Sequence, residues 1–596
     1  MNRFNLKVLK RFWQLVKPYW VSNEKFGAIA ILFLLLSLTL IYTFISISIT
    51  RFQGDLISSL TKLDRERFIT TIWSFLGVLA AYVPLSASAS YLQDKLSNYW
   101  RRWLTYDFLD RYFGNRAFYE LGNFNTEVDN PDQRIAEDIK SFTSESLNFL
   151  LVIFNAIFQM IGYTALIWNI PPKVVILELS NPIKIFNLEI TRIAPSILIV
   201  FLLGYCVIGT LITIGIFGRK LVTINYEQLR KEANFRFGLV RIRENSESIA
   251  FYRGEQQESR NLRKFFTEVF DNYNSLIFWQ DLLLTLFTSA YENIPIILPA
   301  IVVAPSVFSG DVEVGKVREA QIAFGQFFFS INIIVSRFQF WTAFVAGIDR
   351  LYLLKEYLED TVKKHHQVLS EKPLITTVEE DAISLENVTL QTPNYQRTLV
   401  NNLSLNLPQG EGLLIMGASG CGKSSLLRAI AGLWSSGTGL IHRPELSQML
   451  FLPQKPYMIL GTLRSQLAYP NDDNQISDLD LYYALDVVNL PDLAERFGGF
   501  DLEKDWDEVL SLGEQQRLAF ARIIINKPRY VILDEATSAL DINNEAKLYQ
   551  HLIKTRTTFV SVGHRPTLIK YHNWILNISE NQQWKLDSTA NFQPKN

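Results

Sequence analysis

The C-terminal half of the chain contains the run Gly417-Ala418-Ser419-Gly420-Cys421-Gly422-Lys423-Ser424. It follows a strand-like apolar segment at residues 412–416, and a helix is expected to begin near Lys423. The glycines permit a tight loop whose backbone N–H groups cradle phosphate, while the lysine reaches the terminal phosphates and the Ser424 hydroxyl ligates magnesium. We therefore predict a nucleotide-binding loop, with Ser425 as a further binding residue.

A second run supports this prediction and reads Tyr530-Val531-Ile532-Leu533-Asp534-Glu535. Its apolar residues are typical of a buried strand, and two carboxylates follow at the end of that strand. We expect Asp534 to hold magnesium and Glu535 to polarise the attacking water. Adjacent carboxylates after a strand can also cap a solvated helix, but their order after the phosphate loop favours catalysis.

The N-terminal half is membrane-like. Six apolar stretches lie at residues 26–49, 68–92, 147–168, 193–217, 276–303 and 322–345. Each has about the 20 residues that a helix needs to cross the hydrocarbon core. A soluble core could hardly bury all six, so the overall composition of 48% hydrophobic and 20% charged residues averages two different halves. We predict six spans within a transmembrane domain at residues 26–358.

Basic residues set the orientation of these spans. They concentrate between spans two and three and between spans four and five, which places both connections in the cytoplasm by the positive-inside rule. Residues 1–25 alternate basic and aromatic side chains, as in an amphipathic helix on the surface of the lipid bilayer. Trp100 and Trp103 are interpreted as anchors at the membrane edge.

Three other segments have simpler interpretations. Residues 173–179 and 183–190 are expected to form a hairpin around Ser180-Asn181-Pro182, either as a lid or as an ordinary surface insertion at residues 171–192. A polar linker is expected at residues 359–381, where His365 and His366 are solvated and bind no metal. Residues 226–252 are expected to form a cytoplasmic helix, whose mixture of acidic and basic side chains argues against nucleic-acid binding.

A third motif lies between the first two and has the sequence Leu510-Ser511-Leu512-Gly513-Glu514-Gln515-Gln516-Arg517. In this order, and after a membrane-like half, the three motifs resemble the ATPase of an ABC transporter. The resemblance implies a multidomain membrane protein: a six-helix all-α transmembrane domain of ABC exporter type, followed by an α/β P-loop ABC ATPase domain at residues 382–596. It also implies ATP and Mg²⁺ as cofactors.

Several residue roles follow from the resemblance alone. Gln454 corresponds to the Q-loop glutamine that links magnesium and water to the membrane domain, and His564 to the switch histidine near the γ-phosphate. Residues 538–541 match the D-loop. Ser511, Gly513 and Glu514 are expected to bind phosphate at a helix N-terminus.

The chain departs from the family pattern at three positions. Leu512 replaces the first glycine of the signature and Glu514 replaces its glutamine. Thr392 stands where an aromatic residue usually stacks on adenine, so Tyr395 is the nearest substitute. In this family ATP lies between the phosphate loop of one ATPase and the signature of another. A chain with one of each resembles a half-transporter, and a homodimer is expected.

The membrane half resembles one branch of the family, which contains peroxisomal ABC subfamily D and the bacterial SbmA/BacA-like proteins. The resemblance rests on the runs at residues 100–105, 130–138 and 243–255. In the last run, Glu247 and Arg253 are expected to couple the spans to the ATPase.

Members of this branch carry acyl-CoAs, antimicrobial peptides and other hydrophilic solutes, or cobalamin. We expect a bacterial inner-membrane transporter of a hydrophilic solute, with import as one direction that the exporter-like topology leaves open. An acyl-CoA or lipid-like substrate, and an ATPase that gates a channel or regulates a partner without moving cargo, remain alternatives.

Two charged residues fall inside predicted spans. Glu292 lies in span five and Arg337 in span six. Charges within a bilayer usually face a partner or a water-filled cavity. Either both residues line the translocation cavity, with Glu292 the stronger candidate for contact with cargo, or they pair with each other or with neighbours to hold the bundle together.

Overall fold

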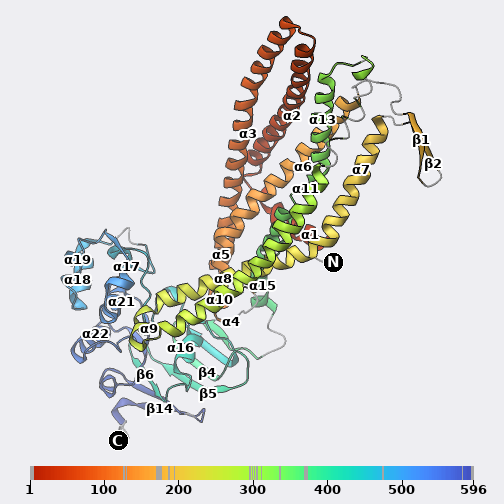
Figure 1. Cartoon of the computed structure of the whole chain (residues 1–596). Coiled ribbons are helices and arrows are strands. Elements are labelled where there is room, and N and C mark those ends of the chain that lie inside the picture. The colour runs from red at the N-terminus through yellow and green to blue at the C-terminus, as the bar shows by residue number, and fades with distance from the viewer. Residues whose placement is uncertain are drawn as a thin grey trace. The chain divides into compact units, whose positions relative to one another are not determined.

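The computed structural model in Figure 1 divides the chain into two compact units, Met1–His365 and His366–Asn596. It describes residues 6–124, 128, 130–168, 178–185, 188–192, 195–293, 297, 300, 303, 307–310, 312–333, 337–367, 373–472, 476–579 and 581–591. The first unit is helical and the second is α/β. The predicted order of a helical domain followed by an α/β domain is therefore confirmed.

The first unit consists of long helices and one hairpin. Its elements are α1 (Leu6–Trp20), α2 (Lys25–Thr61), α3 (Arg65–Phe113), η1 (Gly114–Arg116), α4 (Ala117–Phe124), α5 (Pro131–Gln133), the π-helix η2 (Arg134–Asp138), α6 (Ile139–Trp168), β1 (Glu178–Ile185), β2 (Leu188–Arg192), α7 (Pro195–Ile212), the π-helix η3 (Thr213–Gly218), α8 (Arg219–Glu244), α9 (Ser246–Tyr252), α10 (Glu255–Leu276), the π-helix η4 (Ile277–Leu284), α11 (Thr285–Asn293), α13 (Gly315–Ile331) and α15 (Phe338–Gln367).

Three helices in the described part of the chain are long and apolar enough to cross a membrane: Lys25–Thr61, Arg65–Phe113 and Pro131–Ile167. A fourth is added if Gly204–Gly218 and Lys220–Glu244, which meet at a bend of 42°, count as one span. The fifth predicted span falls on η4 and α11 and then runs partly outside the described residues. The sixth is divided between α13 and α15. The number six therefore stays a prediction.

The helix α13 begins in close contact with α2. A Cβ atom added to Gly315 would lie 1.9 Å from the backbone oxygen of Gly54. Beside this contact, Glu313 forms ion pairs with Lys62 at 2.5 Å and with Arg67 at 3.1 Å. Hydrogen bonds from Arg67 and Lys62 lower the pKa of Glu313 to about 2. Charge and close packing together fix this end of α2, α3 and α13.

Aromatic packing joins α1 to α3 farther along the chain. Tyr19 of α1 stacks on Trp100 of α3 with 5.6 Å between the ring centroids, and both side chains are 1% exposed. Leu15 is buried in the same cluster. The interpretation of Trp100 as a membrane-edge anchor is therefore wrong, because the ring fills the core between α1 and α3. The amphipathic helix α1 likewise presents part of its apolar face to the protein.

The π-helix η2 connects two distant helices. Asp138 forms an ion pair with Arg350 of α15 at 3.0 Å, and Arg134 donates from Nη1 to the Arg350 carbonyl at 2.8 Å. On its exposed side, Glu137 lies 3.5 Å from Arg236 of α8. The run at residues 130–138 thus links the base of α6 to α15 and to α8.

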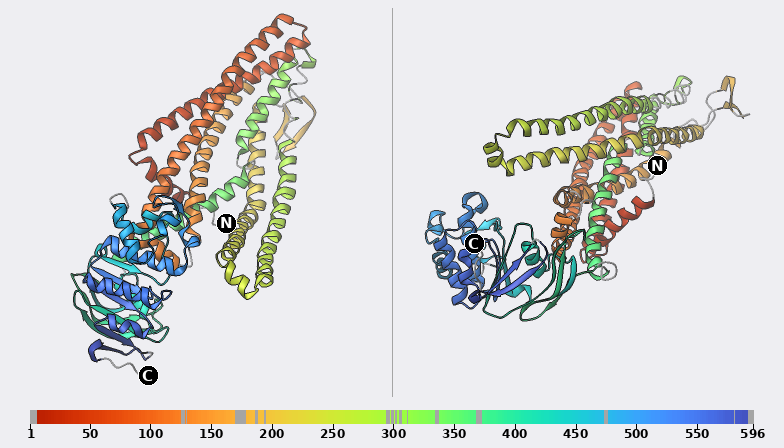
Figure 2. Two further views of the ribbon diagram at one scale, coloured as in Figure 1. Left: turned by 90° about the vertical axis from the view of Figure 1, so that its left-hand side faces the viewer. Right: turned by 90° about the horizontal axis from the view of Figure 1, so that it is seen from below.

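The helices α8 and α10 run side by side with α9 at their tip, as both views of Figure 2 show. Asn245 separates α8 from α9, and Arg253 ends α9 in the left-handed conformation at φ 53°. Glu247, Phe251, Tyr252 and Arg253 are exposed at this tip. The predicted cytoplasmic helix is therefore two helices, and both predicted coupling residues lie at the turn.

Two predicted boundaries are wrong. The hairpin exists, but Ser180-Asn181-Pro182 lies inside β1, at an irregularity in the register between Glu178 and Ile183. Proline has no N–H for a ladder and is tolerated at such irregularities. The residues at its turn lie outside the described part. The predicted linker begins inside α15, which continues to Gln367, and β3 already starts at Thr376.

The second unit has two main sheets and a set of covering helices. Its elements are β3 (Thr376–Glu379), β4 (Ile383–Gln391), β5 (Thr398–Leu407), β6 (Gly412–Gly417), α16 (Lys423–Ile430), β7 (Gly437–Arg443), η7 (Leu446–Gln448), β8 (Met449–Leu452), β9 (Gly461–Thr462), α17 (Leu463–Ala468), α18 (Asp478–Val487), α19 (Leu493–Arg496), β10 (Glu503–Lys504), α20 (Trp506–Val509), α21 (Leu512–Asn526), β11 (Tyr530–Asp534), α22 (Ile542–Lys554), β12 (Thr558–Val562), η8 (Pro566–Tyr571), β13 (Trp574–Ile578), β14 (Trp584–Ser588) and η9 (Thr589–Asn591).

A six-stranded sheet in the order β14-β13-β6-β12-β11-β8 organises this unit. All neighbours pair in parallel except β13 and β14. Buried apolar residues on its two faces belong to two clusters, one shared with α17, α18, α21 and α22 and one shared with α16 and the four-stranded sheet β3-β7-β4-β5. Parallel strands that are buried on both faces have continuous apolar sequences, and Val531-Ile532-Leu533 is an example.

The contact between Gly54 and Gly315 gives a test of the packing of the first unit. We expect Gly315→Ala to destabilise the protein by about 1–3 kcal/mol, because the added methyl group meets the fixed backbone of Gly54 as well as the Ser58 hydroxyl. Gly325→Ala, in the same helix, is the control, since its Cβ meets no atom within 4 Å. Thermal unfolding of both variants in detergent measures the difference, and equal unfolding temperatures would contradict the contact.

Candidate nucleotide site

The phosphate loop leaves β6 and enters α16 through three glycines with positive φ. The φ angles of Gly417, Gly420 and Gly422 are 148°, 79° and 102°. A side chain at Gly417 would meet the Ile578 carbonyl at 2.3 Å, so backbone freedom and close packing both require glycine there. Ala418, Ser419 and Gly420 form the exposed face of the loop. The predicted strand, loop and helix are confirmed in this order.

Two other loop residues point inward. The Cys421 side chain is buried in the core beneath the loop, and that of Lys423 is 7% exposed. The Lys423 ammonium donates to the carbonyls of Gly417 and Ala418 at 2.8 and 2.9 Å. The cation therefore stays inside the ring formed by the loop, where phosphate oxygens would replace the carbonyls. Ser425 lies half-buried in the first turn of α16.

The predicted magnesium residues meet beside the loop. The Ser424 hydroxyl donates to Asp534 Oδ1 at 3.0 Å. Burial raises the pKa of Asp534 above its usual range, although the Ser424 hydrogen bond opposes the shift. No group of three or more His, Cys, Asp or Glu side chains in the described ranges is arranged to hold a metal. One hydroxyl and one carboxylate nevertheless fit Mg²⁺, which commonly takes its other ligands from phosphate and water.

Glu535 lies between the two other predicted catalytic side chains. Gln454 donates from Nε2 to Glu535 Oε2 at 3.1 Å, and His564 Nε2 lies 3.2 Å from Glu535 Oε1. The backbone of Glu535 has φ 51°, a conformation that costs free energy for a residue other than glycine. The Glu535 N–H donates to the Val562 carbonyl at 3.1 Å and holds the carboxylate in this place. The structure thus brings Gln454, Glu535 and His564 together.

The signature residues form the start of α21. Ser511 is the N-cap, its hydroxyl accepts from the Glu514 N–H, and Glu514 accepts from the Ser511 N–H in return. This arrangement is a capping box. Arg496 donates to the other oxygen of Glu514 at 2.6 Å. The Leu512 side chain is exposed, and Gly513 packs close to the Ala539 carbonyl. Leu512 therefore leaves the helix N-terminus accessible.

Two residues that the motifs did not single out join these loops. Gln516 is fully buried; it donates to the Gln454 carbonyl at 2.8 Å and accepts from the Ala539 N–H at 3.0 Å. Arg565 donates to the carbonyls of Ser538 and Leu540 at 2.8 Å each. Both side chains therefore fix the D-loop relative to the signature helix and the switch histidine. A polar side chain inside an apolar helical pattern was the one sequence signal for Gln516.

Tyr395 lies in the turn after β4 with φ 60°, and its hydroxyl donates to the Pro373 carbonyl at 3.1 Å. Its N–H donates to the Thr392 carbonyl at 2.7 Å. The ring is half-buried. Its role against adenine stays a prediction.

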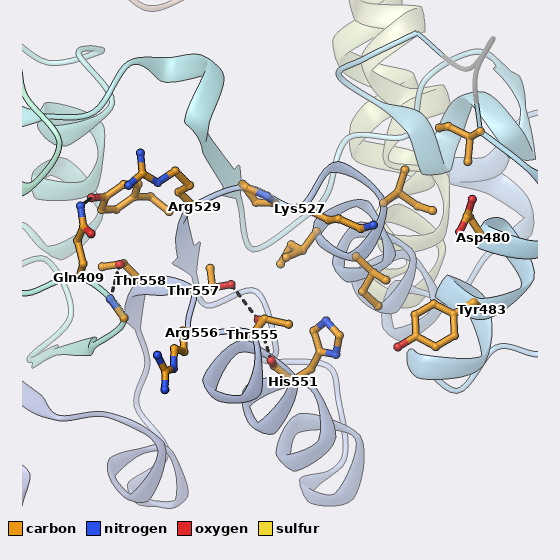
Figure 3. Close-up of a pocket in the computed structure, with 17 residues that line it drawn as sticks. Gln409, Asp480, Tyr483, Lys527, Arg529, His551, Thr555, Arg556, Thr557 and Thr558 are labelled. Atoms are coloured by element: carbon orange, nitrogen blue, oxygen red, sulfur yellow. Dashed lines mark hydrogen bonds between the residues drawn. The ribbon is translucent and has the colours of Figure 1, made fainter.

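A cavity of about 720 Å³ lies elsewhere in the second unit (Figure 3). It is lined by residues that precede β6, β11 and β12, including Gln409, Arg529 and Thr557, and by residues of α18 and α21. Ligands of parallel α/β sheets bind at the carboxyl ends of the strands. Because this cavity is at the opposite ends, it is not the nucleotide site.

The two predicted cavity residues of the first unit lie apart. Glu292 accepts from Asn332 Nδ2 at 3.4 Å and is half-buried. Arg337 lines a small cavity with Glu145 and Asn148 of α6. Within the described residues, no ion pair joins Glu292 to Arg337, so the alternative in which these two residues pair with each other is not what the structure shows.

Fold and site together define an ATPase unit fused to a helical membrane unit. A family model described as ABC transporter transmembrane region 2 matches residues 15–308, and one described as ABC transporter matches residues 400–538. The chain belongs to the ABC transporters, in the group of half-transporters that includes the D family. It is an integral membrane protein that couples ATP hydrolysis to transport.

Similar proteins come from bacteria, plants and animals. An uncharacterized ABC transporter ATP-binding protein of Synechocystis is 46% identical over 90% of this chain and 78% of its own length. The chloroplastic ABC transporter D family member 2 of Arabidopsis thaliana is 37% identical over 96% and 86%. A human lysosomal cobalamin transporter is 30% identical over 98% and 97%.

The contacts of Glu535 lead to a prediction for hydrolysis. We expect Glu535→Gln to bind ATP but to lose about 100- to 10,000-fold in turnover, because an amide keeps the size of the side chain and cannot orient water as a base. Lys423→Ala, by contrast, should weaken nucleotide binding itself. Phosphate release and nucleotide affinity of the purified variants separate the two effects. Near-normal turnover of Glu535→Gln would rule out the catalytic assignment.

Proposed function

We propose that the chain acts as a homodimeric transporter that uses ATP to move a hydrophilic solute across a membrane, most simply a bacterial inner membrane with the ATPase unit in the cytoplasm. The observation that carries this proposal is the presence of one phosphate loop and one signature helix in the chain. A second copy supplies the missing partner of each. Two equivalent ATP sites would then form between the copies.

At each site, the residues of the phosphate loop would hold the phosphates, with Lys423 as the cation. Ser424, Asp534 and Gln454 would hold Mg²⁺, which offsets phosphate charge during transfer. Glu535 would orient the attacking water, with His564 beside the terminal phosphate. The contacts from Gln454 and His564 to Glu535 support these roles.

Coupling would use the exposed tip of the α8–α10 hairpin. Glu247 and Arg253 are exposed there beside Phe251 and Tyr252, and the left-handed Arg253 turns the chain back. Alanine at Glu247 and Arg253 should then lower transport more than basal ATP hydrolysis. Equal loss of both activities would favour damage to folding.

A cobalamin-like or peptide-like solute fits the proposal best. The human relative that covers nearly the whole chain is named a lysosomal cobalamin transporter. Inside the first unit, helices contact each other through neutral polar groups, such as Thr43 with Asn155 and Gln159 with Ser330. Direction is proposed as import.

Reconstitution of the full chain in liposomes tests this function. ATP-dependent accumulation of labelled cobalamin, compared with labelled peptide and acyl-CoA, would identify the class of cargo. The Glu535→Gln chain provides the background. ATP hydrolysis without movement of any of the three would support the alternative of an ATPase that regulates a partner.

A variant of Glu292 tests in the same assay whether this residue contacts cargo. We propose that it lines the translocation cavity, with Arg337 as a weaker candidate. The half-buried Glu292 carboxylate accepts from the neutral amide of Asn332 and, among the described residues, forms no ion pair, so its charge remains available to cargo. Glu292→Gln keeps shape and hydrogen bonding and should impair transport while basal ATPase stays near normal. Full transport would refute the cavity role, and loss of the folded dimer would assign Glu292 to the structure of the bundle.

A further inference from the structure

The signature of this chain carries a carboxylate, that of Glu514, in the first turn of its helix. Glu514 is the third residue of α21, within the first turn, where the helix N-terminus would receive phosphate. A negative side chain in the first turn stabilises a helix, but it repels a negatively charged ligand at the same place. Unless Glu514 is neutralised, it therefore opposes the binding of ATP, in contrast to the phosphate-binding role that the signature implies for it.

The two oxygens of this carboxylate have separate partners. Oε2 accepts from the Ser511 N–H and from the Ser511 hydroxyl, both at 2.9 Å. Oε1 accepts from Arg496 Nη2 at 2.6 Å. Arg496 ends the short helix α19 and lies over the Phe497 ring at 4.9 Å, which limits its movement. One arginine thus holds the carboxylate from the side away from Ser511.

Glu514 is charged in this arrangement. Burial raises the pKa of Glu514. The Arg496 guanidinium and the Ser511 hydrogen bonds together lower it by more, so the pKa lies below its usual range. The side chain of Glu514 is 16% exposed and that of Arg496 is 41% exposed. Water therefore screens this charge only in part, and Arg496 is its counterion.

We propose that Arg496 is a positioning residue for ATP: its guanidinium neutralises and anchors Glu514, so that Ser511 and the N-terminus of α21 can receive the terminal phosphate of ATP held by the second copy. This inference rests on the proposed homodimer. When ATP arrives, Glu514 keeps its bonds to Arg496 and to the Ser511 N–H. The Ser511 hydroxyl then turns its proton from the carboxylate to the phosphate.

The test is a double-mutant cycle in the ATPase assay of the full chain in nanodiscs. Arg496→Ala leaves a bare carboxylate near the phosphate and should raise the KM for ATP about 3- to 10-fold, with kcat nearly unchanged. High salt should shrink this increase, because screening weakens exposed charges. Arg496→Lys, which keeps the charge, should stay within about twofold of the original KM.

The double variant distinguishes two explanations for a raised KM: repulsion by an unpaired Glu514, or loss of a structural link between α19 and α21. Adding Glu514→Gln to Arg496→Ala removes the repulsion, and we expect the KM to return to within about twofold of its original value. A purely structural link between α19 and α21 predicts the opposite, since the double variant would lose at least as much as the single one. An unchanged KM in Arg496→Ala, or no recovery in the double variant, would overturn the proposal.

Arg464→Ala is the matched control. Arg464 forms ion pairs with Asp478 and Asp501 at 2.8 Å each and lies over the Phe500 ring at 5.7 Å, but these contacts do not involve the signature. Its loss should lower the unfolding temperature without changing the KM. An equal rise in KM would show that any lost ion pair in this region has the same effect and would contradict the inference.

A separate experiment tests whether two copies of the chain associate when ATP binds. The Glu535→Gln chain with ATP should associate its ATPase units, which cross-linking between copies detects. If association is seen and Arg496→Ala has no effect, only the role of Arg496 is wrong. If ATP produces no association between copies, the composite site itself is wrong, and the inference fails with it.

Discussion

The parallel register of β6, β12, β11 and β8 is the constraint on which the nucleotide site depends. In this register Ile415 pairs with Val562, Val562 with Asp534, and Leu533 with Leu452. All four strands therefore end at one edge of the sheet. The phosphate loop follows β6, His564 follows β12, Glu535 follows β11 and Gln454 follows β8. Ser424 and Asp534, 110 positions apart, meet because neighbouring parallel strands point the same way.

The loops at this edge are connected to one another by side chains rather than by sheet hydrogen bonds. Gln516 joins the backbone of the Q-loop to that of the D-loop, and Arg565 joins the D-loop to the segment of the switch histidine. Glu545, 1% exposed, accepts from Arg565 and from Thr537. A buried network with its partners satisfied is costly to break. A shift at one loop is therefore carried to the others.

Local sequence patterns predicted most of this edge and little of what surrounds it. The phosphate loop and the strand at Tyr530–Asp534 could be predicted, because glycine spacing and a buried apolar run are local signals. Trp100 was misinterpreted and Arg496 was missed, since their partners lie far away in the sequence or in another helix. The turn of the β1–β2 hairpin was misplaced because Asn-Pro is typical of turns and of strand irregularities alike. The roles of the site residues remain predictions.

Contacts within the membrane unit differ in strength along its helices. At one end, Glu313 with Lys62 and Arg67 forms a charged cluster beside two touching glycines. Between α2 and α6, the side-chain hydrogen bonds are single and neutral, such as Ser46 with Tyr163. Bonds of this kind contribute only about 0.6 kcal/mol each on average in a membrane protein. These neutral contacts therefore cost less to exchange than the charged cluster that Glu313 forms with Lys62 and Arg67.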